Sequence, residues 1–124
     1  PNDLANNIRE LINEKLIELQ GSELIPKRHY IGFVLNGSSF STICYIKFRK
    51  TKILFDIIRG VHNPDGFKSN NYFTLDDPKK IVNNRSRILN NGTTQKSYRI
   101  SIDVNSDLDY LMFLIKQKYN SLAS

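Results

Sequence analysis

The pattern of apolar positions predicts a helix at each end of the chain. The first helix runs from an N-cap at Asp3 to a stop at Gly21, and its apolar positions recur every three or four residues. Those positions are Leu4, Ile8, Leu11, Ile12, Leu16 and Leu19. The closing helix opens with Ser106 and Asp109, which form a variant of the capping box. Its buried positions are Leu108, Leu111, Met112, Ile115 and Tyr119.

Between the helices, alternating apolar and polar positions predict a set of strands. The clearest runs are His29–Leu35, Thr42–Arg49, Lys52–Arg59 and Ser97–Asp103. A short turn at Lys50-Thr51 separates the second run from the third, so these two runs are predicted to form a hairpin with a basic tip. In the last run the alternation directs Tyr98 and Ile100 inward and Arg99 outward.

Turn and cap residues indicate what connects the strands. Asn36-Gly37 begins a tight hairpin turn after the first run, and Asn63–Gly66 marks a turn within a longer loop. A short extended piece, Tyr72–Leu75, is a candidate edge strand. Asp77 is then a suitable N-cap and Pro78 a suitable first residue for a short helix that carries basic side chains.

This order of elements predicts an α+β fold. We expect an N-terminal helix, a small and mostly antiparallel sheet with a short inserted helix, and a C-terminal helix packed on the sheet. The 124 residues suit one domain with one core, spanning residues 1–124. Because the first residue is Pro1, the chain is interpreted either as a protein that has lost its initiator methionine or as a domain excised from a longer chain.

Positive charge is concentrated in the middle of the chain. The whole sequence carries 18 Lys and Arg against 12 Asp and Glu, a net charge of +6. Residues 27–99 hold fourteen bases and four acids, whereas both flanks are mildly acidic. A concentrated positive field attracts phosphate backbones, anionic lipids or acidic proteins. The alternative interpretation is a solvated surface on which lysine accumulates without binding a ligand.

The lone cysteine and the lengths of the apolar runs indicate a cytoplasmic protein. Cys44 lies in a strand-like apolar run and cannot form an internal disulfide, so we interpret it as a small buried side chain in a reducing compartment. No apolar stretch approaches the ~20 residues that span a bilayer, and no signal peptide opens the chain. We therefore expect no membrane partner.

The sequence gives little support to an enzyme, and we assign no catalytic residue, metal site or cofactor. His62 and Asp65 could both bind a metal, but two ligands in one loop are a weak signal, and no paired Cys/His spacing occurs. The run Asp77-Pro78-Lys79 spells part of the motif of metal-dependent nucleases, but its proline does not suit a strand. A metal enzyme that uses Asp56, Asp65 or Asp77 is therefore the third-ranked hypothesis.

Binding is the favoured role, because aromatic and basic residues alternate along the strand region. The aromatic residues are Tyr30, Phe33, Tyr45, Phe48 and Phe55. Exposed rings can stack on nucleobases, although a sheet flanked by helices is expected to bury many of them. We expect eight basic side chains, on the hairpin and around the short helix, to contact the phosphates of a nucleic acid with weak sequence specificity. They are Lys47, Arg49, Lys50, Lys52, Lys79, Lys80, Arg85 and Arg87.

The second half of the chain carries a familiar order of motifs. These motifs are the step Asp76-Asp77-Pro78, the strand that begins at Tyr98 and the closing helix Asp107–Tyr119, and upstream Tyr30–Phe33 matches a first strand. Over roughly residues 28–120 the chain resembles a prokaryotic domain-of-unknown-function family of about 110 residues, some members of which are labelled "predicted transport protein". That family often has a Gly-His-Trp-Gly stretch where this chain has Ile88–Thr94, with neither His nor Trp.

Members of this family are often attached to nuclease or restriction-type proteins, so the resemblance implies an accessory role in a prokaryotic restriction or defence-type protein. The leading hypothesis is a non-enzymatic module for nucleic-acid binding, DNA binding included, whose other partners are domains or subunits of the same system. The alternative is a protein–protein interaction or dimerisation domain without nucleic-acid binding, which predicts an exposed apolar patch or a homodimer. The transport label has no physical support, because no segment is long and apolar enough to enter a membrane.

Overall fold

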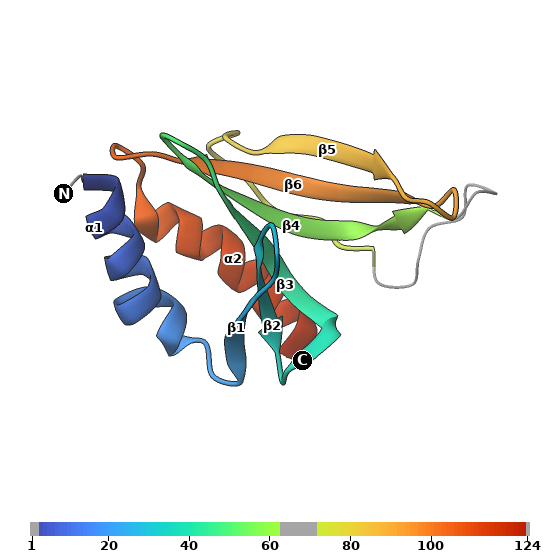
Figure 1. Cartoon of the computed structure of the whole chain (residues 1–124), viewed down its shortest axis with the longest axis horizontal. Helices are drawn as coiled ribbons and strands as arrows, with labels where there is room; N and C mark the ends of the chain where they lie inside the picture. Colours follow the sequence, from blue (N-terminus) through green and yellow to red (C-terminus); the bar gives the residue numbers. More distant parts are fainter. Residues whose placement is uncertain (1–2, 63–71, 124) are drawn as a thin grey trace.

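The computed structural model describes residues 3–62 and 72–123, which form an N-terminal helix, a six-stranded antiparallel sheet and a C-terminal helix (Figure 1). The expected α+β class is therefore confirmed. The regular elements are α1 (Asp3–Glu10), β1 (Ser22–Pro26), β2 (Ile31–Leu35), β3 (Ser38–Phe48), β4 (Ile53–His62), β5 (Asn83–Ile88), β6 (Thr94–Ile102) and α2 (Leu108–Ala123).

The N-terminal helix changes its winding beyond α1. A π-helical turn, η1 (Leu11–Lys15), and a 3-10 turn, η2 (Leu16–Glu18), follow directly. Leu11 and Leu16 are five positions apart, which is the hydrogen-bond spacing of a π turn, and both are 3% exposed. The local winding thus keeps both leucines in the core. Gly21, with a φ of 82°, follows the helical region as expected.

The strands lie in the order β1-β2-β3-β4-β6-β5, and each neighbouring pair is antiparallel. The predicted β3–β4 hairpin is confirmed, and its turn is closed by the Arg49 N–H, which donates to the Lys52 carbonyl at 2.9 Å. Asn36 and Gly37 have φ values of 55° and 68° and make the predicted tight turn between β2 and β3. Strand β1, which ends at Pro26, is not predicted from the sequence. It lies at the sheet edge, where proline is tolerated.

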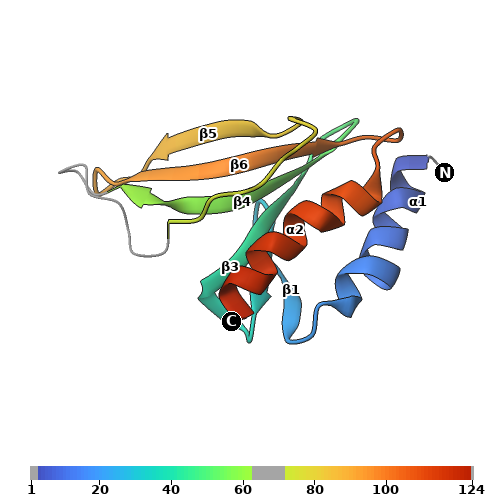
Figure 2. The same ribbon diagram turned by 180° about the vertical axis from the view of Figure 1, so that it is seen from behind.

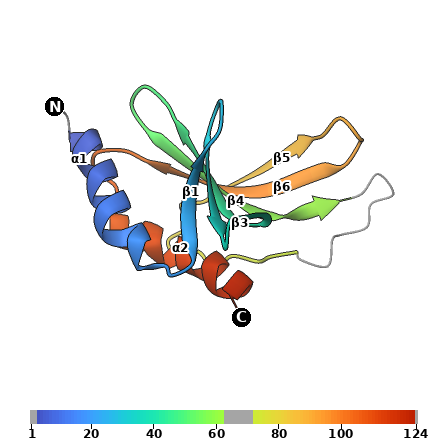
Figure 3. The same ribbon diagram turned by 60° about the horizontal axis from the view of Figure 1, so that its bottom comes forward.

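One face of the sheet packs against α2 and forms the core (Figure 2). The core includes Phe55, Ile57, Ile100, Leu111, Leu114 and Ile115, all of which are 0% exposed. Burying each such side chain contributes roughly 1.5–3 kcal/mol relative to leaving it in water. Helix α1 lies on the same side as α2, whereas β4, β6 and β5 extend beyond both helices (Figure 3). The opposite face of the sheet is therefore left without a covering helix within the described residues.

The short helix predicted from Pro78 onward is wrong. Pro78 and Lys79 form a turn, and the chain then enters strand β5. The Asp77 carboxylate does accept a backbone hydrogen bond, but it comes from Val82, five residues on, at 2.9 Å. Lys80 has a φ of 54°, a left-handed conformation that is incompatible with a continuing α-helix. Asp77 therefore caps a turn and does not begin a helix.

Strand β5 is the second edge of the sheet and pairs with β6 alone. All six of its residues are exposed, because neither helix reaches this part of the sheet. Its alternation places Arg85 and Arg87 on one face and Ser86 and Ile88 on the other. The two arginines predicted on or beyond a helix thus lie side by side on a strand.

Two smaller expectations are also corrected. Tyr72–Leu75 is not a ladder strand; its Leu75 N–H donates to the Tyr98 hydroxyl at 3.3 Å. Asp107, and not Ser106, caps α2. Its Oδ1 accepts hydrogen bonds from the backbone N–H groups of Asp109, at 3.0 Å, and Tyr110, at 3.2 Å. The Ser106 hydroxyl is occupied in the preceding turn, where it accepts the Asp103 N–H at 2.9 Å.

Candidate functional site

The face of the sheet that points away from α2 carries polar and charged side chains from four adjacent strands. The strand register sets Tyr45 (β3), Asp56 (β4), Arg99 (β6) and Asn83 (β5) opposite one another in a single row. Directly opposed residues of antiparallel strands point to the same face, with Cβ atoms about 4.5–5.5 Å apart. The row thus brings an aromatic ring, a carboxylate, a guanidinium and an amide onto one surface, which we call the outer face.

Asp56 is the centre of a charge cluster on the outer face. Arg99 donates to it through two nitrogens, at 2.8 Å from Nε and 3.0 Å from Nη2, and Lys47 Nζ lies 3.0 Å from its second oxygen. Asp56 itself is 4% exposed. Burial alone would raise the pKa of Asp56, but the hydrogen bonds from Arg99 and Lys47 hold that pKa below its usual value. The carboxylate is therefore ionised and serves to hold two cations in place.

A cavity of about 220 Å³ opens beside this cluster and is called the outer cavity below. Tyr30 and Tyr45 line one side, with ring centroids 5.0 Å apart and ring planes at 80°. Arg85 and Arg87 line the other side. Pockets that enclose a whole small-molecule ligand measure roughly 300–1,000 Å³. The outer cavity is smaller, so it suits part of a larger molecule better than an entire metabolite.

The lining of the outer cavity has a strong excess of positive charge. Among the described residues that line it are four cations, Lys47, Arg85, Arg87 and Arg99, and one carboxylate, which is an excess of three positive charges. Arg85 and Arg87 are exposed and form no ion pair with any residue in the described ranges. Their guanidinium groups are therefore available to an anionic ligand, for which arginine offers planar, two-pronged hydrogen bonding.

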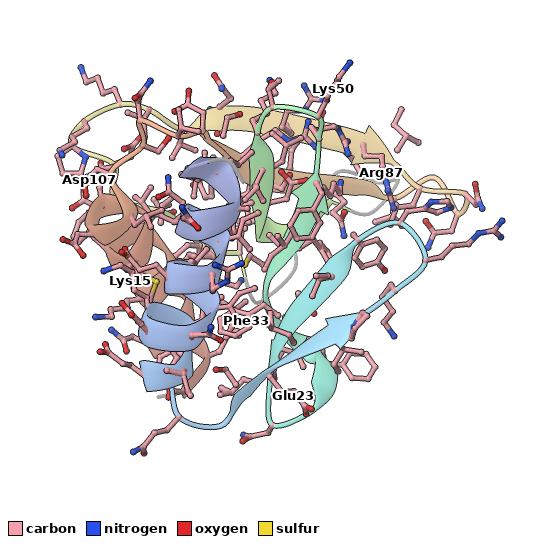
Figure 4. The ribbon with its side chains drawn as sticks, turned by 60° about the vertical axis from the view of Figure 1, so that its left-hand side comes forward. Lys15, Glu23, Phe33, Lys50, Arg87 and Asp107 are labelled. Atoms are coloured by element: carbon pink, nitrogen blue, oxygen red, sulfur yellow. The ribbon has the colours of Figure 1, made fainter. Side chains whose placement is uncertain are left out.

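The predicted hairpin cations lie next to this region. Arg49, Lys50 and Lys52 are exposed at the tip of the β3–β4 hairpin, and Lys47 on β3 lines the end of the outer cavity that is nearest to this tip. In Figure 4, Lys50 and Arg87 both lie at the upper right of the view, and Figure 1 shows that the β3–β4 turn and the arrowhead end of β5 are at opposite ends of the sheet. Six of the eight predicted cations thus belong either to the outer cavity or to the hairpin tip beyond it.

The remaining two predicted cations, Lys79 and Lys80, lie elsewhere, beside the start of α2. Lys79 Nζ is 3.4 Å from an Asp107 oxygen and 4.6 Å from the centre of the Tyr110 ring. Figure 4 shows Asp107 on the opposite side of the view from Arg87. The sequence groups these two lysines with Arg85 and Arg87 because all four are predicted on or just beyond one short helix.

Sequence reasoning missed Asp56 and Arg99 as parts of this site. Arg99 is correctly predicted on the outward face. Residues 83–88 are not predicted as a strand, so the sequence does not place Arg85 and Arg87 beside Arg99. The interleaved aromatic residues divide between the core and the outer face. Phe33 and Phe55 are 2% and 0% exposed in the core, whereas Tyr30 and Tyr45 line the outer cavity.

The structure gives little support to two kinds of catalytic site, a cysteine nucleophile and a metal site. Cys44 is fully buried, and burial raises the pKa of its thiol far above the usual value, so it is unsuited to act as a nucleophile. No group of three or more His, Cys, Asp or Glu side chains is placed to hold a metal ion within residues 3–62 and 72–123. Asp65, the partner suggested for His62, lies outside the described residues, as does the Asn63–Gly66 turn.

Comparison with protein-family models and with curated proteins gives no match to this chain. In the part of the chain that the structure describes, neither helix has the length and apolar character needed to cross a membrane.

Proposed function

We propose that this chain is a non-enzymatic nucleic-acid-binding module, an accessory part of a cytoplasmic prokaryotic restriction or defence-type protein. The observation that carries the proposal is the outer cavity, where Arg85 and Arg87 are exposed, without an ion-pair partner in residues 3–62 and 72–123, beside a half-buried tyrosine pair. The accessory role in such a system rests on the family resemblance of residues 28–120 alone. Nucleic acid and neighbouring domains or subunits are the proposed partners.

The distribution of charge supports a phosphate backbone as the ligand. The cavity cations lie on β3, β6 and β5, and the tip of the β3–β4 hairpin adds Arg49, Lys50 and Lys52 beyond the end of β3. Such a surface contacts several phosphates at once, and each neutralised phosphate releases counterions. Affinity should then depend steeply on salt and little on base sequence, with dissociation constants of about 10⁻⁴–10⁻⁶ M at physiological ionic strength.

The proposal is tested by titrating labelled single- and double-stranded DNA and RNA at about 50 and 200 mM salt. The double variant Arg85→Glu/Arg87→Glu should abolish binding at the higher salt and weaken it strongly at the lower. Lys79→Glu/Lys80→Glu is the matched control, because it changes the net charge by the same amount on the other side of the molecule. Circular dichroism of each variant confirms that it is folded.

Two results would overturn the proposal. One is the absence of binding to any of these nucleic acids at the lower salt. The other is an equal loss of affinity in the two double variants, since this would show that only net charge, and not the outer cavity, attracts the ligand.

Strand β5 favours a second candidate, the interaction domain without nucleic-acid binding. Its outer edge has no partner among the described residues, and Ile88 at its end is 77% exposed. A free strand edge is a template for pairing with another chain. This candidate predicts a stable complex or homodimer that survives high salt and is lost when a proline is placed in β5, together with indifference to nucleic acid.

A further inference from the structure

The two walls of the outer cavity differ in chemistry, and this difference bears on the kind of nucleic acid that fits. Tyr30, just before β2, and Tyr45, on β3, meet edge to face, with centroids 5.0 Å apart. In that arrangement the rings are not stacked on each other, so a ring face remains for another planar group. Both tyrosines are partly exposed and both line the cavity.

The basic wall lies across the sheet from the tyrosines. Strands β3 and β5 are three strand spacings of about 4.8 Å apart, so their backbones are separated by roughly 14 Å. The side chains that extend between them make the cavity narrower than this. Arg85 and Arg87 extend from β5 into the same cavity and have no ion-pair partner in the described ranges. Between the walls, Asp56 is fully engaged by Arg99 and Lys47.

A nucleic-acid segment can contact the tyrosines and the arginines at the same time only if one of its bases is unstacked from its neighbours. Stacking of a base on an aromatic ring is worth about 1–3 kcal/mol, and it requires an exposed base face. In a duplex the base faces are covered by neighbouring base pairs. The phosphates of a duplex can therefore bind the arginines, but its bases cannot stack on the tyrosines. A single strand offers phosphates and base faces together.

We propose that the outer cavity is a single-strand site, in which one unstacked base packs on the Tyr30–Tyr45 pair and the adjoining phosphates bind Arg85 and Arg87. This inference rests on the proposed function and narrows its ligand to single-stranded nucleic acid. The small volume of the cavity, about 220 Å³, agrees with the entry of one base from a chain that continues over the basic surface.

The test compares oligo-dT and oligo-rU with a duplex of equal length, using the whole chain. Wild type should bind both single strands more tightly than the duplex. Tyr45→Leu should weaken single-strand binding by roughly 5- to 150-fold, as the loss of one stacked base implies, and should leave duplex binding nearly unchanged. Tyr45→Phe, which keeps the ring, should retain most of the affinity. Phe40→Leu is the matched control, because Phe40 is 95% exposed and does not line the cavity.

Tyr30→Leu provides a second variant should Tyr45→Leu fail to fold, and tyrosine fluorescence provides a second measurement. The chain has six Tyr and no Trp, so quenching on binding reports on the tyrosines, and it should fall in either leucine variant. Unchanged single-strand affinity in both leucine variants, with affinity still lost in Arg85→Glu/Arg87→Glu, would overturn the single-strand site while leaving the proposed function intact. No binding of any oligonucleotide would overturn both.

Discussion

Replacing Asp56 by Asn should destabilise the fold, because it removes the charge that holds two cations on the outer face. The new side chain has nearly the same size, but it cannot compensate Arg99 and Lys47. Removing one partner of a fully buried ion pair costs about 3–5 kcal/mol. Here the partner side chains are 19% and 25% exposed, so water can partly solvate them after the change. We therefore expect a loss of about 2 kcal/mol in the free energy of unfolding.

Urea denaturation measures this loss directly. With a slope of about 1.5 kcal/mol per molar urea, the unfolding midpoint should fall by about 1.3 M. Asp109→Asn is the matched control, because Asp109 pairs with Lys15 at 2.8 Å but its side chain is 87% exposed. Its midpoint should stay close to that of wild type. Similar midpoints for Asp56→Asn and wild type would refute the view that this cluster stabilises the sheet.

The pH dependence of the same variant follows from the direction of the pKa shift. In the folded state, hydrogen bonds from Arg99 and Lys47 outweigh burial and keep the pKa of Asp56 below its usual value. The stabilisation is therefore present above the unfolded-state pKa, about 3.9, and is lost as the pH falls through the lower folded-state pKa. Wild type and Asp56→Asn should differ above about pH 5 and converge as the pH falls below the folded-state pKa of Asp56. A constant difference across this range would contradict the assignment.

The same variant also tests whether Asp56 only stabilises the fold or also positions Arg99 and Lys47 for ligand binding. Asp56→Asn adds one net positive charge to the outer cavity and frees Arg99 and Lys47 from their carboxylate. Affinity for single-stranded DNA at low salt should therefore rise, although stability falls. A loss of affinity in the folded variant would mean that Asp56 positions the cations for binding and does not merely compensate them.

Two further substitutions and one thiol reaction probe other parts of the fold. Leu114→Ala in α2 removes a side chain that is 0% exposed, and urea denaturation should show a loss of about 3–4 kcal/mol. Gly37→Ala places a side chain at a φ of 68° in the β2–β3 turn, and thermal unfolding should show a loss of about 1 kcal/mol. Because burial is complete and raises the pKa of its thiol, Cys44 should react with a thiol reagent only after urea unfolds the chain.

The elements that could be predicted from the sequence are those in which local pattern and burial agree. Helix α2 buries the leucines of its apolar stripe, and β6 buries Tyr98 and Ile100 while turning Arg99 outward, as alternation alone requires. The β3–β4 hairpin follows from its short polar turn. In these segments the core imposes a periodicity that a single sequence displays.

Strand β5 could not be predicted, because the core imposes no pattern on it. All of its residues are exposed, and its strand conformation depends on backbone pairing with β6, which leaves no trace in the side chains. The Asp77-Pro78 step also reads as a helix start, and only the contact with Val82 and the left-handed Lys80 show it to be a turn. The error carried over to the site, since it separated Arg85 and Arg87 from Arg99.

The most direct test of the central claim is the slope of log affinity against log salt for a single-stranded oligonucleotide. Each phosphate neutralised on a single strand contributes about −0.7 to that slope. If Arg85 and Arg87 each contact one phosphate, Arg85→Ala/Arg87→Ala should make the slope shallower by about 1.4, whereas Lys79→Ala/Lys80→Ala should leave it unchanged. An unchanged slope in the arginine variant, or an equal change in the two variants, would contradict the assignment of the outer cavity as the nucleic-acid site.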